Sequence, residues 1–370
     1  PSLRHAPSHP PRRAAAAGTT TMGLEVEAGT IKIDWQSPDA AGGFGAVYFA
    51  QTLSGQDVVV KVAFSDEFSE KLLENERYFN DRLVASVPRR QGRNWASYLG
   101  EFAIPANVEG FPKEVSKVRA LVFSREPGTT LDLLMLSDDD AFASALSLPT
   151  VKKATASHLR ARLCRKVLGE LLCGVVHLHA RGIMHRDVKP ENILVTPGDP
   201  VSPVKLIDLG SGCDLGTPLK RGLMDETIDP IYAPPELRVD MRYPDRYDSF
   251  CAAVTCLRVL MPSLGRDITL TQEWSEQLKG VNYDLTQWLQ NKAQEESASE
   301  TRDEALELLE PHHSNTLQLL SGMLHADITK RTTPENALAA LGPMWAARLK
   351  SVETLSRQGG GGGSRGSELA

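Results

Sequence analysis

The side chains most able to take part in a chemical reaction occur in one short polar string and at one acid that follows it. The string His185–Asn192 reads H-R-D-V-K-P-E-N, and it follows a long apolar helix pattern. A strand-like pattern comes next, and a second strand-like pattern ends at Asp208. The carboxylates of Asp187 and Asp208 therefore border one site, and the ammonium of Lys189 lies close to the first of them in the sequence.

These residues resemble the catalytic and metal-binding loops of eukaryotic protein kinases, in which H-R-D-x-K-P-x-N is followed by an acidic triplet, here D-L-G from Asp208. The resemblance implies transfer of the γ-phosphate of ATP, with Asp187 orienting and deprotonating the acceptor hydroxyl. Asn192 and Asp208 would hold Mg²⁺, which prefers oxygen ligands. Lys189 would stabilise the γ-phosphate, and a lysine at this position favours serine or threonine over tyrosine acceptors.

Each segment alone has a plainer explanation. The residues around Asp187 could form a surface turn, and Asp208 could be an ordinary acid at a strand end. Only their combination makes the catalytic interpretation stronger. The two acids are a few residues farther apart than in the family, and the proline-containing segment 197–203 is expected to form a turn that absorbs the difference.

Residues 40–47 read A-A-G-G-F-G-A-V and resemble the glycine-rich loop of protein kinases, with Ala40 in place of the first glycine. Small residues let backbone N–H groups approach phosphate oxygens, and Gly42 and Gly45 can adopt positive φ without strain. A merely tight hairpin is the rival explanation. The predicted nucleotide-binding residues in this segment are Gly42, Gly43, Gly45 and Val47.

Lys61 ends the strand-like string V-V-V-K, which matches the V-A-I-K motif of the family. The match implies that Lys61 reaches the α- and β-phosphates and pairs with an acid on the following helix. Glu76 is the expected partner because it interrupts an apolar stripe and so faces the strands, and Glu74 is the alternative. An ordinary exposed lysine is the plainer interpretation.

By the same resemblance, Phe123 would border the adenine pocket and residues 124–128 would form the hinge between two lobes. Backbone groups of Arg125 and Glu126 would then meet the adenine ring. This assignment depends on position alone, so simple core packing is an equally good interpretation of Phe123.

The segment from Asp208 to Glu236 is expected to be the activation segment. It ends in Y-A-P-P-E where the family has A-P-E, so Pro234 replaces the alanine. Arg331 is placed to pair with Glu236 as a buried structural ion pair.

Arg186 is the residue type that clamps an anion on the activation segment of such kinases. Thr217 and Thr227 are candidate phosphate acceptors there. Asp225 and Glu226 could instead supply the negative charge permanently, and both alternatives stay open.

The elements that must position these residues change in character along the chain. Strand-like segments 30–35, 46–53 and 56–63 come first, then a helical pattern over 67–85, and another strand-like segment, 117–123, follows. From Ser157 onward helical patterns prevail, which indicates α+β architecture rather than an alternating parallel sheet.

With the resemblance, these patterns predict a two-lobed protein-kinase-like fold, with a β-rich N-lobe that contains one helix and a mainly helical C-lobe. The N-lobe is expected over residues 29–124 and the C-lobe over residues 125–347. Residues 1–28 are acid-poor and rich in arginine, serine and alanine, which predicts a disordered or transit-like segment. Residues 348–370 are expected to be a glycine-rich tail or linker scar.

The overall composition excludes several other classes of protein. The 370 residues include 41 Lys+Arg and 47 Asp+Glu, a formal charge of −6, so binding of nucleic acid through charge is not expected. No apolar run reaches the ~18 residues of a membrane-spanning helix, so none is expected in this chain.

We therefore expect a protein serine/threonine kinase that uses ATP and Mg²⁺ and acts on protein substrates. The rival interpretations are a catalytically weak pseudokinase scaffold and a small-molecule phosphotransferase of related fold. Within the family, the predicted helix segment 74–80, the D-L-G triplet and the Y-A-P-P-E ending resemble the corresponding segments of plastid state-transition kinases, which phosphorylate light-harvesting antenna proteins. That resemblance implies a chloroplast location on the stromal side of the thylakoid, with the cytoplasm as the alternative.

Overall fold

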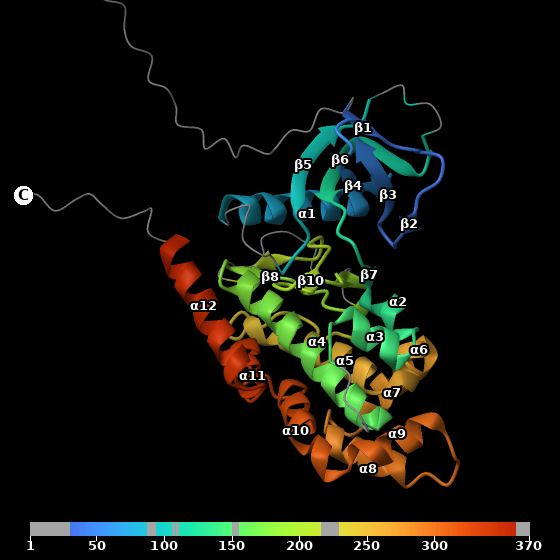
Figure 1. The fold of residues 1–370 in the computed structure, drawn as a ribbon, viewed down its shortest axis with the longest axis vertical. Helices are drawn as coiled ribbons and strands as arrows, with labels where there is room; N and C mark the ends of the chain where they lie inside the picture. The colour runs from blue at the N-terminus through green and yellow to red at the C-terminus, as the bar shows by residue number, and fades with distance from the viewer. Residues whose placement is uncertain are drawn as a thin grey trace, which may run out of the picture.

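The computed structural model describes residues 30–86, 94–105, 108, 111–149, 155–215 and 229–359. An antiparallel sheet and one long helix form the N-terminal part, and helices form most of the remainder (Figure 1). The predicted α+β fold with a β-rich N-lobe and a helical C-lobe is confirmed.

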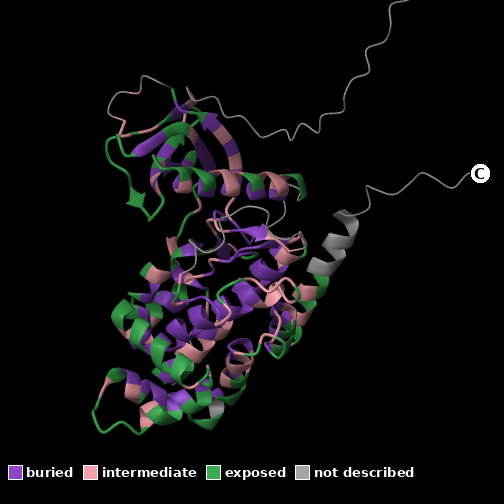
Figure 2. Ribbon diagram, turned by 180° about the vertical axis from the view of Figure 1, so that it is seen from behind, coloured by how far each residue is buried: buried purple, intermediate pink, exposed green. Residues whose placement is uncertain are grey.

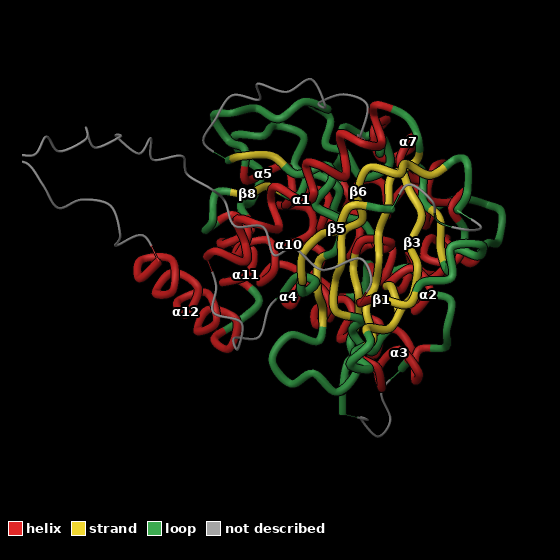
Figure 3. The backbone as a smooth tube through the Cα atoms, turned by 90° about the horizontal axis from the view of Figure 1, so that it is seen from above, coloured by secondary structure: helices red, strands yellow, loops and turns green. Residues whose placement is uncertain are grey.

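The N-lobe sheet has the strand order β1-β3-β4-β6-β5, and β2 pairs with β3 near its start. All these pairs are antiparallel, and the strands run side by side when seen from above (Figure 3). The elements of this lobe are β1 (Ile31–Lys32), β2 (Ala40–Ala41), β3 (Gly45–Thr52), β4 (Asp57–Phe64), α1 (Glu67–Ser86), β5 (Tyr98–Ala103) and β6 (Val115–Ser124).

Alternation along β4 determines where its lysine points. Val58, Val60 and Val62 have no exposed surface and belong to the core of the sheet. Because successive side chains of a strand point to opposite faces, Lys61 lies on the other face. That face looks toward α1, whose buried residues include Leu72, Glu76 and Phe79.

The predicted first strand is shorter in the structure than residues 30–35. Pairing of β1 with β3 stops after Lys32, and the side chain of Asp34 accepts a hydrogen bond from the N–H of Gln36 at 3.0 Å. This local turn competes with strand pairing. Trp35 still packs against Tyr48, with ring centroids 5.1 Å apart.

The C-lobe is built around α4 and α5, whose residues are largely buried (Figure 2). Thr155 caps the N-terminus of α4 by accepting a hydrogen bond from the N–H of His158. The helices are α2 (Leu131–Met135), α3 (Asp139–Ala145), α4 (Ala156–His179), α5 (Asp245–Leu260), α6 (Pro262–Arg266), α7 (Ile268–Gly280), α8 (Leu285–Ala293), α9 (Glu300–Leu308), α10 (Ser314–Met323), α11 (Pro334–Ala340) and α12 (Pro343–Gly359).

Two small sheets hold the loops that follow α4. One has the order β10-β9-β7 and the other pairs β11 with β8. Their strands are β7 (Thr129–Thr130), β8 (Ile183–Met184), β9 (Ile193–Val195), β10 (Val204–Leu206) and β11 (Cys213–Asp214). Within the described part of the chain, no helix has the length and apolar character needed to cross a bilayer.

Candidate active site

The loop between β8 and β9 brings three of the predicted catalytic groups together. The amide nitrogen of Asn192 donates to the Oδ2 atom of Asp187 at 2.7 Å and to its carbonyl at 2.9 Å. The ammonium of Lys189 lies 3.0 Å from the Oδ1 atom of Asp187. Burial raises the pKa of Asp187, and the opposite effect of Lys189 does not cancel this shift. Asn192 and Lys189 thus each contact a different oxygen of the Asp187 carboxylate and fix its orientation.

A buried acid from α5 fixes the start of this loop. Asp248 has no exposed surface and accepts hydrogen bonds from the N–H groups of His185 and Arg186 at 2.9 and 2.8 Å. Its Oδ2 atom also lies 2.8 Å from the Nε2 atom of His179. Arg186 has a φ of 67°, a strained backbone that costs about 1–3 kcal/mol unless its surroundings impose it. Asp248 supplies part of that constraint.

Lys61 forms ion pairs with one acid from each of the two lobes. Its ammonium lies 2.7 Å from Glu76 on α1 and 2.9 Å from Asp208, which follows β10. Burial alone would lower the pKa of Lys61, but the carboxylates of Asp208 and Glu76 raise it above its ordinary value. The predicted pairing with a helix acid is present, and Glu76 is that acid.

The alternative partner, Glu74, is engaged elsewhere. Its carboxylate lies 2.6 Å from Arg77 and 3.2 Å from Arg119. Glu74 is therefore part of a separate set of ion pairs on the outer side of α1.

Asp208 also adopts an uncommon backbone conformation, with a φ of 63°. Its Oδ1 atom accepts the N–H of Gly210 at 3.1 Å, and its Oδ2 atom contacts Lys61. Burial alone would raise the pKa of Asp208, but Lys61 and this hydrogen bond lower it. The carboxylate is thus kept ionised, as a cation ligand must be.

The glycine-rich segment forms the tight connection between β2 and β3, where the N–H of Gly42 donates to the carbonyl of Gly45 at 3.0 Å. Neither Gly42 nor Gly45 uses the positive φ that a glycine can adopt. Gly45 is needed for another reason: a Cβ atom there would lie 2.3 Å from the carbonyl oxygen of Val62. Val47 pairs with Lys61 across the strands, on the face that carries the lysine.

The predicted hinge residues follow β6. Phe123 is 7% exposed and packs in a core cluster against Tyr98, with ring centroids 5.4 Å apart. The N–H of Arg125 donates to the carbonyl of Asp57 at 3.2 Å, so this donor already has a partner. The carboxylate of Glu126 lies 3.4 Å from the ammonium of Lys205. Contact of this backbone with adenine stays a prediction.

The end of the activation segment is anchored as expected. The Arg331 guanidinium donates to both carboxylate oxygens of Glu236 at 2.7 and 2.8 Å, and Arg331 is 1% exposed. The candidate phosphate acceptors and the acids proposed to replace them lie outside the described residues: Thr217, Asp225, Glu226 and Thr227.

Sequence reasoning missed Asp229 as a neighbour of the catalytic loop. Its Oδ2 atom lies 3.6 Å from the ammonium of Lys189. No local spacing connects these residues, because most of the activation segment lies between them in the sequence. The only available signal was the position of Asp229 shortly before the Y-A-P-P-E string.

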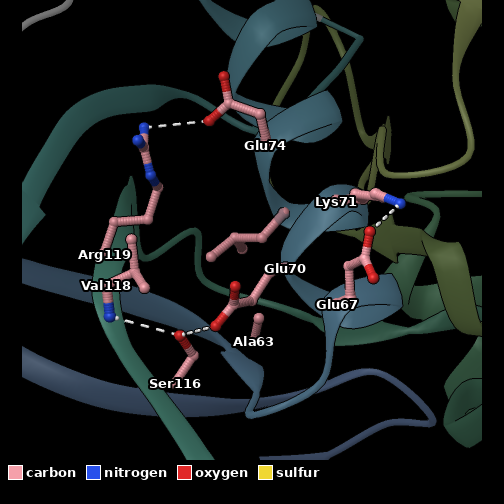
Figure 4. A pocket seen from close by; sticks show the side chains of 9 residues that line it. Ala63, Glu67, Glu70, Lys71, Glu74, Ser116, Val118 and Arg119 are labelled. Carbon is pink, nitrogen blue, oxygen red and sulfur yellow. Dashed lines mark hydrogen bonds and ion pairs between the residues drawn. The ribbon is translucent and has the colours of Figure 1, made fainter. Parts of the chain in front are cut away.

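A cavity outside this site is lined by residues of α1 and of the sheet (Figure 4). It has a volume of about 240 Å³ and lies between α1 and β6. In Figure 4, Glu70 points to Ser116 and Glu74 points to Arg119 across the cavity. The catalytic-loop residues do not line it.

Comparison with known proteins places this geometry in a family. Residues 133–341 match the family model described as protein kinase domain. The chain is 30% identical over 200 residues to the serine/threonine-protein kinase STN7, chloroplastic, of Arabidopsis thaliana. The aligned stretch covers 48% of this chain and 35% of that relative. It is 28% identical over 267 residues to the serine/threonine-protein kinase STN8, chloroplastic, of the same plant, covering 65% of this chain and 50% of the relative.

The chain thus spans between about a third and a half of the length of these relatives. Among solved structures, it is similar to the crystal structure of a Stt7 homolog from Micromonas algae soaked with ATP. The TM-score is 0.67 at 25% sequence identity, over 93% of this chain and 97% of that chain. The resemblance drawn from the sequence is confirmed, and this chain belongs to the protein kinase domain family.

Proposed function

We propose that this chain is an active serine/threonine protein kinase that transfers the γ-phosphate of MgATP to hydroxyl groups of proteins. One observation carries the proposal: Lys61 contacts both Glu76 and Asp208, so a strand, a helix and the C-lobe meet at one cation. Asp187, Lys189 and Asn192 form a second, directly bonded group on the neighbouring loop. A pseudokinase scaffold has no need for both groups.

The residues present fit MgATP. The close approach of Gly45 to Val62 leaves no room for a side chain, which brings the turn backbone next to the sheet. Asp208 and Asn192 offer oxygen atoms, the donors that Mg²⁺ prefers, and would hold the ion together with phosphate oxygens. When bound, the ion would neutralise charge on the phosphates.

Each residue of the chain then has a defined task. Lys61 would neutralise the α- and β-phosphates, while Glu76 keeps its ammonium in place. Asp187 would accept a hydrogen bond and then the proton from the acceptor hydroxyl. Lys189 would balance the charge of the transferred group, since phosphoryl transfer depends mostly on positioning and electrostatic stabilisation.

The proposal extends to the location and the substrates of the chain. The relatives STN7 and STN8 are described as chloroplastic, which supports a chloroplast location for this chain. The resemblance to state-transition kinases supports light-harvesting antenna proteins on the stromal side of the thylakoid as acceptors. Both points are inferences from similarity.

Phosphate transfer to thylakoid proteins tests the proposal directly. The purified chain is incubated with Mg²⁺ and γ-labelled ATP, with isolated thylakoid membranes or with a pool of small hydroxylated metabolites as acceptors. The proposal predicts label on serine and threonine of membrane proteins, and none when Asp208→Asn replaces the wild-type chain.

Label that appears only on metabolites would identify a small-molecule phosphotransferase. ATP binding without transfer to either acceptor pool would identify a pseudokinase. Label on serine or threonine of the chain itself, but on neither acceptor pool, would preserve the kinase activity and reject thylakoid proteins as its substrates.

A further inference from the structure

The last helix, α12, is anchored on α4 by a tryptophan. α12 begins after residue 341, where the match to the family model ends, and it runs along the side of the C-lobe (Figure 1). Trp345 is 6% exposed and packs over Gly169 of α4, where a Cβ atom would overlap the indole ring. The glycine therefore lets the tryptophan lie directly on the backbone of α4.

One buried acid of α4 gathers two cations at this contact. Glu170 is 2% exposed, and its two carboxylate oxygens lie 2.8 Å from Lys166 of α4 and 2.8 Å from Arg348 of α12. Both cations also lie over the ring of Trp345, at 5.7 and 5.2 Å from its centroid. A buried carboxylate requires such partners, so the guanidinium of Arg348 is held in a defined position.

The same guanidinium reaches beyond α4 to a distant turn. Its Nη1 atom donates to Glu170, and its Nη2 atom donates to the carbonyl of Val201 at 3.1 Å. Val201 belongs to the turn 197–203 between β9 and β10. A planar guanidinium can bond both acceptors at once, whereas the single ammonium of a lysine is a point charge without this fork. Arg348 thus connects the C-terminal helix to the turn.

This turn is connected on its other side to the predicted hinge. The Oδ1 atom of Asp199 accepts the N–H groups of Val201 and Ser202 at 2.9 and 3.0 Å. Its Oδ2 atom lies 2.7 Å from Lys205, whose ammonium lies 3.4 Å from Glu126. Val201 therefore binds Arg348 through its carbonyl and the acid that leads to the hinge through its N–H.

The backbone of the predicted hinge also rests on β9. A Cβ atom at Gly128 would overlap the carbonyl oxygen of Val195, and Thr129 pairs with Val195 across the β7–β9 ladder. Closely packed groups of this kind move together, because no space is left between them. A displacement of β9, β10 and the turn 197–203 would thus displace the end of the hinge.

We propose that Arg348 is a positioning residue for nucleotide binding, which holds the turn 197–203 in place from α12 and thereby fixes the hinge 124–128. Arg348 itself does not touch the nucleotide. The inference rests on the proposed function for the existence of an ATP site, and it adds a residue beyond the segment that the family model matches.

Arg348→Lys tests the connection to the turn. The lysine keeps a positive charge for Glu170 but loses the second arm of the guanidinium. We expect the dissociation constant and the KM for MgATP to rise about two- to fivefold, the effect of one lost hydrogen bond, with kcat nearly unchanged. Isothermal titration with MgATP and steady-state kinetics provide the two readouts.

Arg348→Met removes both contacts of the guanidinium. It should raise the dissociation constant for MgATP at least as much as Arg348→Lys and also lower the melting temperature, because Glu170 loses a partner. Arg242→Met is the matched control, since the side chain of Arg242 is 78% exposed and pairs with Asp240. This control should bind MgATP like the wild-type chain.

A double variant tests whether the effect passes through the turn. If Arg348 and Asp199 act on the same turn, Arg348→Lys combined with Asp199→Asn should weaken MgATP binding no more than about twofold beyond the stronger single variant. Two single effects that multiply would overturn the proposed route.

The titration separates this inference from the kinase proposal, because ATP binding requires no phosphate transfer. Weaker MgATP binding by Arg348→Lys supports the inference even if the chain transfers no phosphate. Normal transfer with an unchanged dissociation constant in Arg348→Lys would reject the inference alone. A loss of kcat and thermal stability at constant KM would show a merely structural role and would also reject it. Absence of MgATP binding by the wild-type chain would overturn both proposals.

Discussion

The ammonium of Lys61 on β4 lies 2.7 Å from the carboxylate of Glu76 on α1. The side chain of Glu76 is 3% exposed, so this ion pair is shielded from water and connects the sheet to the helix. The same ammonium lies 2.9 Å from Asp208. The position of one cation therefore depends on both lobes.

Removal of this cation should abolish most activity. In Lys61→Met, two carboxylates lose their common partner and the phosphates lose a positive charge, so kcat/KM should fall by about 10²–10³-fold. Initial rates of phosphate transfer measure the effect, and circular dichroism checks the fold. Lys71→Met is the control, because Lys71 is 56% exposed at its side chain and pairs with the exposed Glu67. Equal activity of the two variants would contradict the role of Lys61.

The same pair predicts a dependence of activity on pH. Burial raises the pKa of Glu76 to about 7, against the opposite effect of Lys61. Only ionised Glu76 can pair with Lys61, so kcat/KM should rise with pH through about 7. Glu76→Gln should have a lower rate and lack this step. A pH–rate profile of each protein from pH 5.5 to 8.5 provides the measurement, and an identical step in the variant would exclude Glu76 as its origin.

The raised pKa also has a consequence for stability. The folded protein holds a proton on Glu76 at pH values where the unfolded chain has released it. Relative to Glu76→Gln, the free energy of unfolding should therefore fall as pH rises from the ordinary glutamate pKa to about 7. Urea unfolding at several pH values would detect this slope, and a slope of opposite sign would contradict the shift.

Gly45 and Gly43 form a matched pair for the glycine-rich turn. A Cβ atom at Gly45 would clash with the carbonyl oxygen of Val62, whereas one at Gly43 would meet nothing within 4 Å. Gly45→Ala should lower the free energy of unfolding by about 1–3 kcal/mol and reduce activity, as expected when a tight contact is overpacked. Thermal melts compare it with Gly43→Ala, which should be close to wild type. Equal effects of both substitutions would show that the close approach is unimportant.

Local motifs explain why the core of the site could be predicted from the sequence. Asp187, Lys189 and Asn192 occur in one string, and Glu76 was identified because it interrupts a helical apolar stripe. Each of these signals is local, since side chains that lie on one loop or one helical face must lie near one another in space.

Other features could not be predicted because they depend on contacts between distant segments. Asp248 supports the catalytic loop from α5, and Asp229 reaches Lys189 from the far end of the activation segment. The need for glycine at residue 45 comes from an adjacent strand rather than from its own φ. No periodicity or spacing in the sequence encodes such contacts.

The turn that lengthens the segment between Asp187 and Asp208 also has a structural role. The ammonium of Lys205 lies 2.7 Å from Asp199 in this turn and 3.4 Å from Glu126 in the predicted hinge. Burial alone would raise the pKa of Asp199, but hydrogen bonds from Lys205 and backbone N–H groups lower it to about 2. The turn therefore supports the hinge through a lysine that is 4% exposed.

Asp199→Asn should weaken this support. We expect the KM for ATP to rise about five- to tenfold, the effect of losing one charged hydrogen bond, with little change in kcat. Steady-state kinetics with ATP as the varied substrate would show this split. Asp303→Asn, at an acid whose side chain is 69% exposed, is the control. A loss of kcat at constant KM would show that Asp199 acts on the chemistry and not through the hinge.

The rate of a single turnover in Asp187→Asn tests the central claim most directly. Enzyme in excess over γ-labelled ATP is mixed with Mg²⁺ and an acceptor protein, and ATP affinity is measured separately by titration. If Asp187 is the base, the transfer rate should fall by about 10²–10⁴-fold while the dissociation constant for ATP stays within about twofold of wild type. A transfer rate equal to that of the wild-type chain would contradict the account.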